Sequence, residues 1–420
     1  MRVHIARPTQ HPGVADLPVT TRLAEWDLPG IHRVLGVHRH EVKLLELGDV
    51  TYVVKELPDE LADREYRLLR QLADDGLPTI EVVATVTGRT DDGPVDGLLI
   101  TRHLDYSLPY RSLLSGRGLT IPFLGDRMLD ALVGLLVRLH LAGFFWGDCS
   151  LSNALFRRDA GTLSAYVIDV ETGERHERLT DGQRSLDLMI ATDNVAGGLL
   201  DLQEAGRLTA EIDPFTVAQQ IETRYADLWS ELTGSEEFDP SGPADTHLRL
   251  RRRLDRLHRL GFDAEEIDLL TTDRDRSIRI VPRVVEHGFH ADRLQGLTGL
   301  VTGENQARRM LADIREYTAD LQAAQGSAIP ENVAAVRWLD RRFEPIIAAI
   351  PGHLLVRLEA AEIFHQLLEH RWYLTERLGH DISLDDALPS YLEEILATSP
   401  DERLQLDEPT AEIPRIDPIP

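Results

Sequence analysis

The chain has 420 residues, 42% of them hydrophobic, and a mean hydropathy of −0.22. This length exceeds what one hydrophobic core usually serves, so we expect two or three packed units. The 71 acidic and 45 basic residues give a net charge of −26, which argues against nucleic acid or an anionic membrane as a general partner.

The single cysteine, Cys149, excludes an internal disulfide and fits a reducing compartment. The N-terminal residues lack the apolar run of a signal peptide, and no stretch approaches the roughly 18 to 20 apolar residues of a membrane helix. We therefore expect a cytoplasmic protein without membrane insertion.

The first part of the chain predicts an antiparallel sheet. Residues 1–30 hold four prolines and no sustained period, which indicates an irregular arm. Alternating apolar residues then predict five strands, with a helix over 59–72 between the third and the fourth. The strands are expected at 31–37, 41–47, 51–57, 80–86 and 98–103.

A strongly periodic helix over 124–141 precedes the most informative stretch. The loop after it carries Asp148 and Asn153, and Asp169 ends an apolar strand, so three oxygen-bearing side chains are expected to meet. Phosphoryl transfer needs such a set, because its catalysis consists mainly of positioning and charge neutralisation. Asp148 would accept or orient an acceptor hydroxyl, while Asn153 and Asp169 would hold Mg²⁺, which prefers oxygen ligands.

Beyond residue 205 the pattern is mostly helical, with a linker at 234–243. The arginine-rich segment 248–260, followed by a second predicted helix at 264–270, permits a helix-turn-helix interpretation, although such arginines more often pair with acidic neighbours. A short strand at 277–285 and four further helices follow, at 303–324, 330–349, 353–378 and 384–397.

The motif Leu139-His140 … Gly147-Asp148-x-x-x-x-Asn153 … Ile168-Asp169-x-Glu171 resembles the catalytic loop and metal-binding strand of the protein-kinase-like superfamily. The resemblance is strongest to its lipopolysaccharide-kinase and small-molecule-kinase branches and covers residues 30 to 230. A closer resemblance, which extends to residue 400, is to a bacterial, actinobacterial-type family that is defined as a domain of unknown function and grouped with those kinases.

This resemblance implies an α+β, two-lobed protein-kinase-like fold, with a five-stranded antiparallel N-lobe sheet, a helical C-lobe and an all-α C-terminal extension. The expected parts are an irregular arm, an N-lobe, a C-lobe, a mainly helical domain and an acidic disordered tail. Their boundaries are 1–30, 31–104, 105–235, 244–400 and 401–420.

The resemblance also implies roles for residues of the N-lobe. Lys55 is one of only two lysines in the chain, and the other is Lys43. Lys55 would bind the α- and β-phosphates of ATP, and Glu65 would orient the lysine. Glu60 is the alternative glutamate. The simpler interpretation makes Lys55 a solvent-facing strand residue and each glutamate a solvated helix charge.

The glycine-rich phosphate loop of the superfamily is poorly represented, since only Gly36 stands at that turn. We expect Gly36 and Arg39 to contact the nucleotide, with His38 and His40 as further candidates; a solvated turn is the simpler explanation. Glu171 replaces the glycine of protein kinases, indicates a non-protein acceptor, and is assigned to the metal together with Asn153 and Asp169.

Four neighbours of the motif are expected to have structural roles. His140 is predicted to be a satisfied core residue, and Asp187 is predicted to brace the catalytic loop. Trp146 should pack against the metal-binding strand, and Cys149 should be a buried thiol rather than a nucleophile.

We therefore expect an ATP- and magnesium-dependent phosphotransferase that acts on a hydroxyl of a small-molecule, glycan-like or lipid-like acceptor. The alternative is a catalytically weak, nucleotide-binding regulatory or scaffold protein. Protein kinase and nucleic-acid-binding functions have less support. The C-terminal helices are candidates for contact with a protein partner or a second copy.

Overall fold

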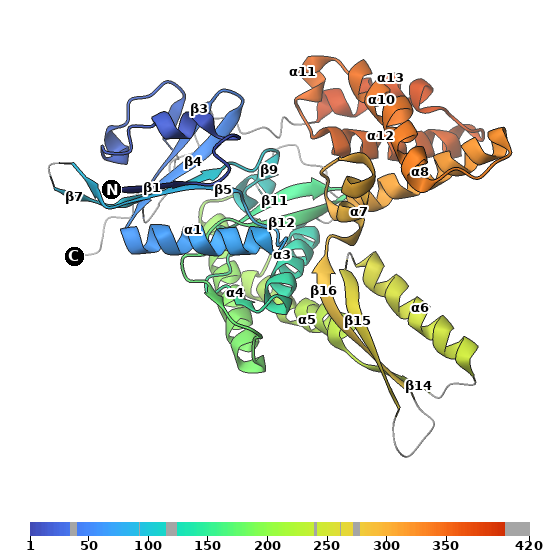
Figure 1. The fold of residues 1–420 in the computed structure, drawn as a ribbon, viewed down its shortest axis with the longest axis horizontal. Helices are drawn as coiled ribbons and strands as arrows, with labels where there is room; N and C mark the ends of the chain where they lie inside the picture. Colours follow the sequence, from blue (N-terminus) through green and yellow to red (C-terminus); the bar gives the residue numbers. More distant parts are fainter. Residues whose placement is uncertain are drawn as a thin grey trace.

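The computed structural model describes residues 1–33, 40–91, 93–114, 124–238, 242–260, 262–271 and 278–399. Figure 1 shows an N-terminal sheet in blue, a mostly helical body in green, and C-terminal helices in orange and red. The α+β class expected from the sequence is confirmed by the antiparallel N-terminal sheet and the mostly helical part that follows it. Within the described residues, no helix has both the length and the apolar character needed to cross a membrane.

The N-terminal sheet has six antiparallel strands rather than five, in the order β1-β5-β8-β4-β3-β2. Five of them arise in the predicted segments. The sixth, β1, comes from the arm expected to be irregular, where a four-residue, mostly exposed strand leaves no clear apolar alternation. The strands are β1 (Arg2–Ile5), β2 (Ile31–Arg33), β3 (Glu41–Leu47), β4 (Val50–Leu57), β5 (Val82–Thr87) and β8 (Gly97–Arg102).

The rest of the arm packs on one face of this sheet. Leu23 and Trp26 are buried in a core that includes Val54 and Ile100. Lys43, the second lysine of the chain, is also buried, and its Nζ donates to the carbonyl of Ala24 at 3.0 Å. Lys43 is therefore explained as an anchor for the arm.

Helix α1 (Asp59–Asp74) covers the other face. Its buried residues recur at three- and four-residue steps, as expected for one apolar side of a helix: Ala62, Glu65, Tyr66, Leu69 and Leu72. All but Glu65 join a large core that continues into helix α3 (Leu124–Leu141), so the N-terminal sheet and the helical body share packed side chains.

The helical body is built on α3 and a hairpin, β11 (Ala154–Asp159) and β12 (Thr162–Val167). Asn153 precedes the first strand and Asp169 follows the second, so both lie at the same end of the hairpin. The other elements of this part are α2 (Tyr110–Leu114), α4 (Asp181–Glu204), α5 (Pro214–Thr233), β9 (Ser107–Leu108), β10 (Phe144–Phe145) and β13 (Glu174–Arg175). A short antiparallel hairpin, β6 (Arg89–Thr90) and β7 (Pro94–Val95), belongs to the N-terminal part.

The C-terminal extension is not all-α. The predicted helix at 264–270 is wrong: the segment lies in β15 (Phe262–Thr271), which pairs with β16 (Ile278–His287) and so confirms the strand predicted there. Pairing with β16 along most of the strand outweighs the helix preference of its Ala-Glu-Glu run. β14 (Glu236–Phe238) completes this small sheet.

Helix α6 (Pro243–Arg259) carries the arginine-rich segment, and a strand rather than a second helix follows it, so the helix-turn-helix interpretation is wrong. Arg253 and Arg256 lie 3.1 and 3.0 Å from Glu231. These two arginines thus pair with an acidic neighbour, as the simpler interpretation held.

The final helices enclose a separate core around Trp338, Phe343 and Phe364. They are α7 (Phe289–Thr298), α8 (Glu304–Gln325), α9 (Glu331–Trp338), α10 (Glu344–Ala349), α11 (Gly352–Leu355), α12 (Ala360–Leu378) and α13 (Leu384–Glu394). The acidic tail predicted at 401–420 lies outside the described residues.

The tip of the β11–β12 hairpin joins the two cores. Asp159, 1% exposed, accepts from the backbone N–H groups of Gln306 at 2.8 Å and Asn305 at 3.1 Å, in the first turn of α8. Glu362 of α12 accepts from the N–H of Ala160 at 3.1 Å. The hairpin that carries Asn153 and Asp169 at one end is thus held by the C-terminal helices at the other (Figure 1).

Candidate active site

Lys55, Glu65 and Asp169 meet in one cluster between the sheet and the helical body. The Lys55 Nζ lies 3.1 Å from Glu65 Oε2 and 3.0 Å from Asp169 Oδ2. Glu65 is 1% exposed, whereas the alternative residue Glu60 is exposed to solvent. Strand β4, helix α1 and the end of the hairpin thus bring together side chains up to 114 positions apart in the sequence.

Burial would lower the pKa of Lys55, but the carboxylates of Glu65 and Asp169 outweigh it and the net pKa is raised. The ammonium is therefore held charged. Burial, with Asp169 second, raises the pKa of Glu65 to about 7. Because Glu171 also approaches, with Oε2 4.0 Å from the Lys55 Nζ, carboxylates outnumber the single lysine, and the site favours an additional cation.

Asp148 and Asn153 lie side by side on the loop after α3. The Asn153 Nδ2 donates to Asp148 Oδ2 at 2.9 Å and to the Asp148 carbonyl at 3.0 Å. With its amide nitrogen engaged, Asn153 has its amide oxygen available for another partner. Burial, and less strongly the charges of Asp169 and Glu171, raise the pKa of Asp148 against the effect of its amide hydrogen bonds.

Asp187 on α4 braces the start of this loop, as the resemblance implied. Its Oδ2 accepts from the Trp146 N–H at 2.7 Å, and its Oδ1 accepts from the Gly147 N–H at 2.9 Å. The buried His140 lies 3.0 Å from Asp187 through Nε2 and 2.7 Å from the Tyr225 hydroxyl through Nδ1. His140 is thus a hydrogen-bonded core residue, as expected.

The strand end at Asp169 is fixed from two sides. The Trp146 Nε1 donates to the Asp169 carbonyl at 2.9 Å, which gives the expected contact with this strand a specific hydrogen bond. The Glu171 N–H donates to Asp169 Oδ1 at 3.0 Å. His40 lies with Nε2 3.5 Å from Glu171 Oε2, while Gly36, His38 and Arg39 lie outside the described residues.

The donor set suits Mg²⁺ better than a soft metal. The side-chain atoms of Asn153 and Asp169 that can bind a cation are oxygens. The Ile168 N–H donates to the Asn153 carbonyl at 3.1 Å, which holds the two chain segments together. In the described part of the chain, no group of three or more His, Cys, Asp or Glu side chains is arranged to hold a metal ion alone. Mg²⁺ in nucleotide sites needs only one or two protein ligands beside phosphate oxygens.

The chain between Asp169 and α4 is short. After a turn it forms β13, which pairs with β10, and α4 begins at Asp181. Arg175 of this segment pairs with Asp75, and Arg184, in the first turn of α4, pairs with Asp181 at 2.6 Å.

Cys149 does not have the character of a nucleophile. It is fully buried, and burial raises the pKa of its thiol well above the usual value.

Asn194, on α4, is a site residue that the sequence did not identify. Its Nδ2 donates to Asp148 Oδ1 at 3.0 Å and to the Cys149 carbonyl at 3.2 Å. The available signal was its position seven residues after Asp187, which places both side chains on one face of a helix.

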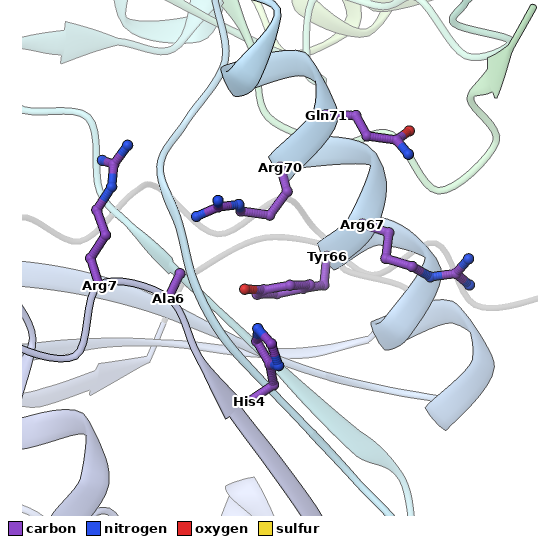
Figure 2. A pocket seen from close by; sticks show the side chains of 7 residues that line it. All are labelled: His4, Ala6, Arg7, Tyr66, Arg67, Arg70 and Gln71. Atoms are coloured by element: carbon purple, nitrogen blue, oxygen red, sulfur yellow. The ribbon is translucent and has the colours of Figure 1, made fainter.

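A separate hollow of about 460 Å³ lies where α1 meets β1 (Figure 2). His4, Arg7, Tyr66, Arg67 and Arg70 are among the residues that line it, whereas Lys55 and Glu65 are not. Its three arginines have acidic partners: Arg7 with Glu81 at 3.2 Å, Arg67 with Asp63 at 3.1 Å, and Arg70 with Asp74 at 3.6 Å. We therefore do not assign this hollow to the site.

Comparison with known proteins gives two family matches. The lipopolysaccharide kinase (Kdo/WaaP) family matches residues 44–190, and the domain of unknown function DUF4032 matches residues 227–396. The chain therefore carries a lipopolysaccharide-kinase family domain, followed by a DUF4032 domain. No curated protein matches the chain.

Two solved structures are similar to parts of the chain. "WaaP in complex with acyl carrier protein" is 20% identical, with a TM-score of 0.32, and the match covers 55% of this chain and 100% of that one. "Crystal Structure of the yeast RNA Pol II CTD kinase CTDK-1 complex" is 17% identical, with a TM-score of 0.25, and the match covers 38% of this chain and 51% of that one.

Proposed function

We propose that this chain, which carries a lipopolysaccharide-kinase (Kdo/WaaP) family domain, transfers the γ-phosphoryl group of ATP to a hydroxyl of a non-protein acceptor in a magnesium-dependent reaction. The observation that carries the proposal is the position of Lys55 between Glu65 and Asp169, at 3.1 and 3.0 Å. On this proposal, residues 31–104 and 105–235 are the two lobes around the nucleotide, and residues 244–400 are an attached domain.

Each side chain then has a defined task. Lys55, held by Glu65, contacts phosphate oxygens, and Asn153 and Asp169, with Glu171 beside them, hold Mg²⁺. Bound Mg²⁺ would neutralise charge on the phosphates. Gly36 and Arg39 remain the predicted nucleotide contacts of the 34–39 segment.

Asp148 faces the acceptor. Its side chain is exposed while both carboxylate oxygens are hydrogen bonded, so it can orient a hydroxyl that enters from solvent. The acceptor oxygen forms a bond to the γ-phosphorus as the bond to the ADP oxygen breaks, and the hydroxyl proton passes to Asp148. The products are the phosphorylated acceptor and ADP.

A non-protein acceptor is supported by the short path from Asp169 to α4 and by Glu171. Small molecules, glycans and lipid-like alcohols all provide the hydroxyl that this chemistry requires. A protein substrate would need a docking surface beyond the residues 170–180 that connect the metal-binding strand to α4.

The test measures ATP turnover by the full chain with and without Mg²⁺, first alone and then with a panel of sugars, glycerol derivatives and other alcohols. We expect turnover that requires Mg²⁺ and is abolished in Asp148→Asn while nucleotide binding remains. Asp193→Asn is the matched control, because this exposed aspartate of α4 makes the same charge change outside the site. Full turnover in Asp148→Asn would refute the proposal.

The alternative is a nucleotide-binding regulatory or scaffold protein. It is favoured by the single glycine, Gly36, in the segment where protein kinases carry three. Nucleotide binding without Mg²⁺-dependent turnover for any acceptor in the panel would support this alternative.

A further inference from the structure

We propose that Asn194 is a positioning residue that sets the orientation of the Asp148 carboxylate from outside the catalytic loop. This inference rests on the proposed function, because it assigns a task to Asn194 in the same reaction. Asn194 would then be the second residue of α4, in addition to Asp187, on which turnover depends.

The contacts of Asp148 show how its carboxylate is held. Oδ2 accepts from the Asn153 amide at 2.9 Å, and Oδ1 accepts from the Asn194 amide at 3.0 Å. Asn153 belongs to the same loop and moves with it, whereas Asn194 belongs to a long helix packed in the main core through Ala191 and Val195. Rotation of the carboxylate would break one of these two hydrogen bonds, so the pair fixes its plane.

Asn194 also fixes the backbone beside Asp148, because its Nδ2 donates to the Cys149 carbonyl at 3.2 Å. Two turns earlier, Asp187 accepts from the N–H groups of Trp146 and Gly147. Together the two side chains of α4 contact four consecutive loop residues, 146 to 149. One face of one helix is therefore the template for the loop.

The residue type fits this task. The two groups that face the Asn194 nitrogen are a carboxylate and a carbonyl, both acceptors, so an amide donor satisfies them. An aspartate here would place a second negative charge beside Asp148, and an apolar residue would leave the Cys149 carbonyl and Oδ1 without this donor. Asparagine supplies the hydrogen bonds without adding charge.

The experiment compares Mg²⁺-dependent ATP hydrolysis by the full chain and by Asn194→Leu, which has a similar size and no donor. Water replaces the acceptor, so a loss cannot come from weaker binding of an acceptor molecule. Because misplacement of a catalytic group by about 1 Å can cost 10²-fold, we expect kcat to fall roughly 10- to 100-fold with the dissociation constant for ATP within about twofold. Asp193→Asn should keep the original kcat.

Asn194→Asp and Asn194→Gln extend the test and provide folded variants should Asn194→Leu fail to fold. The aspartate should lower kcat at least as much as the leucine, and the glutamine, which keeps a donor amide, should recover part of the rate. Thermal unfolding of each variant shows whether α4 is intact. A kcat within twofold of the original in folded Asn194→Leu or Asn194→Asp would overturn the inference.

Asp148→Asn separates this result from failure of the proposed function. If Asp148→Asn abolishes hydrolysis while the Asn194 variants retain it, the positioning role is wrong and the phosphotransferase proposal stands. If the unchanged chain binds ATP without hydrolysis or transfer, both are refuted. A higher dissociation constant for ATP with unchanged kcat would assign Asn194 to nucleotide binding and also overturn the inference.

Discussion

Asp159→Ala should weaken the attachment of the C-terminal helices to the hairpin. Its carboxylate accepts four hydrogen bonds: from the Gln306 N–H at 2.8 Å, the Asn305 N–H at 3.1 Å, the Asn305 Nδ2 at 3.1 Å and the Ser164 Oγ at 3.0 Å. Burial raises the pKa of Asp159, and these donors oppose that rise. The free-energy cost of burying the charged carboxylate is therefore already included in the stability of the native state.

The loss can be worked from these contacts. Removing the carboxylate takes the cap from the first turn of α8, worth about 1 to 2 kcal/mol. It also leaves buried donors without an acceptor, at about 1 to 3 kcal/mol each before relaxation and water entry. Because the four bonds share one group, they do not add fully, and we expect a total of about 3 to 5 kcal/mol.

Native-state hydrogen exchange of the Met310 and Leu311 amides, in buried residues of α8 that do not donate to Asp159, measures this loss. A decrease of about 3 to 5 kcal/mol corresponds to roughly two to four orders of magnitude in protection. Asp385→Ala, at an exposed aspartate of α13, should change exchange by less than a factor of about three. Protection within tenfold of the original in Asp159→Ala would refute the view that this carboxylate holds the two cores together.

Three further predictions concern the site and its support. Glu65→Gln should lower kcat/KM for ATP roughly tenfold or more in steady-state turnover. The substitution weakens a charged hydrogen bond to Lys55 that is worth about 1.5 to 3 kcal/mol. An unchanged kcat/KM would mean that Glu65 does not orient the lysine. Burial lowers the pKa of His140, so on acidification the unfolded chain takes up a proton before the native protein does. The contribution of neutral His140 to the free energy of unfolding is therefore complete above about pH 6.5 and is lost below it, by up to about 1.4 kcal/mol per pH unit. In urea unfolding, the difference in stability between the original chain and His140→Gln should narrow from pH 7.5 to 5.5; a constant difference would contradict this account. Gly143→Ala should lower the free energy of unfolding more than Gly161→Ala does. Both glycines have φ near +77°, but only at Gly143 would the added Cβ collide with the His176 carbonyl oxygen, so equal losses of about 1 to 2 kcal/mol in urea unfolding would contradict the steric account.

The sequence allowed the α+β class and the main cluster to be predicted, because the proposed phosphoryl transfer requires particular side chains at the ends of short elements. The spacing from Asp148 to Asn153 and the apolar strand before Asp169 depend on local sequence alone. Lys55 and Glu65 could be identified because strand and helix periodicity are also local, and the structure brings both to Asp169. Their roles in a reaction remain predictions.

What the sequence did not provide depends on contacts between distant segments. Strand β1 exists because β5 offers an edge, and β15 is a strand because β16 pairs with it. The acceptors that Asn194 and Asn305 face lie on other elements, 46 and 146 positions away, and single-sequence patterns carry no record of such pairs.

Strand β1 has a practical consequence for shortened versions of the chain. It covers the outer side of β5, five of whose six residues are buried. Deletion of the first residues would leave a row of unpaired N–H and C=O groups along an apolar strand, which is a template for edge-to-edge aggregation. A fragment prepared for crystallisation should therefore keep Arg2–Ile5, and a bulky fusion partner attached next to them should favour insoluble material.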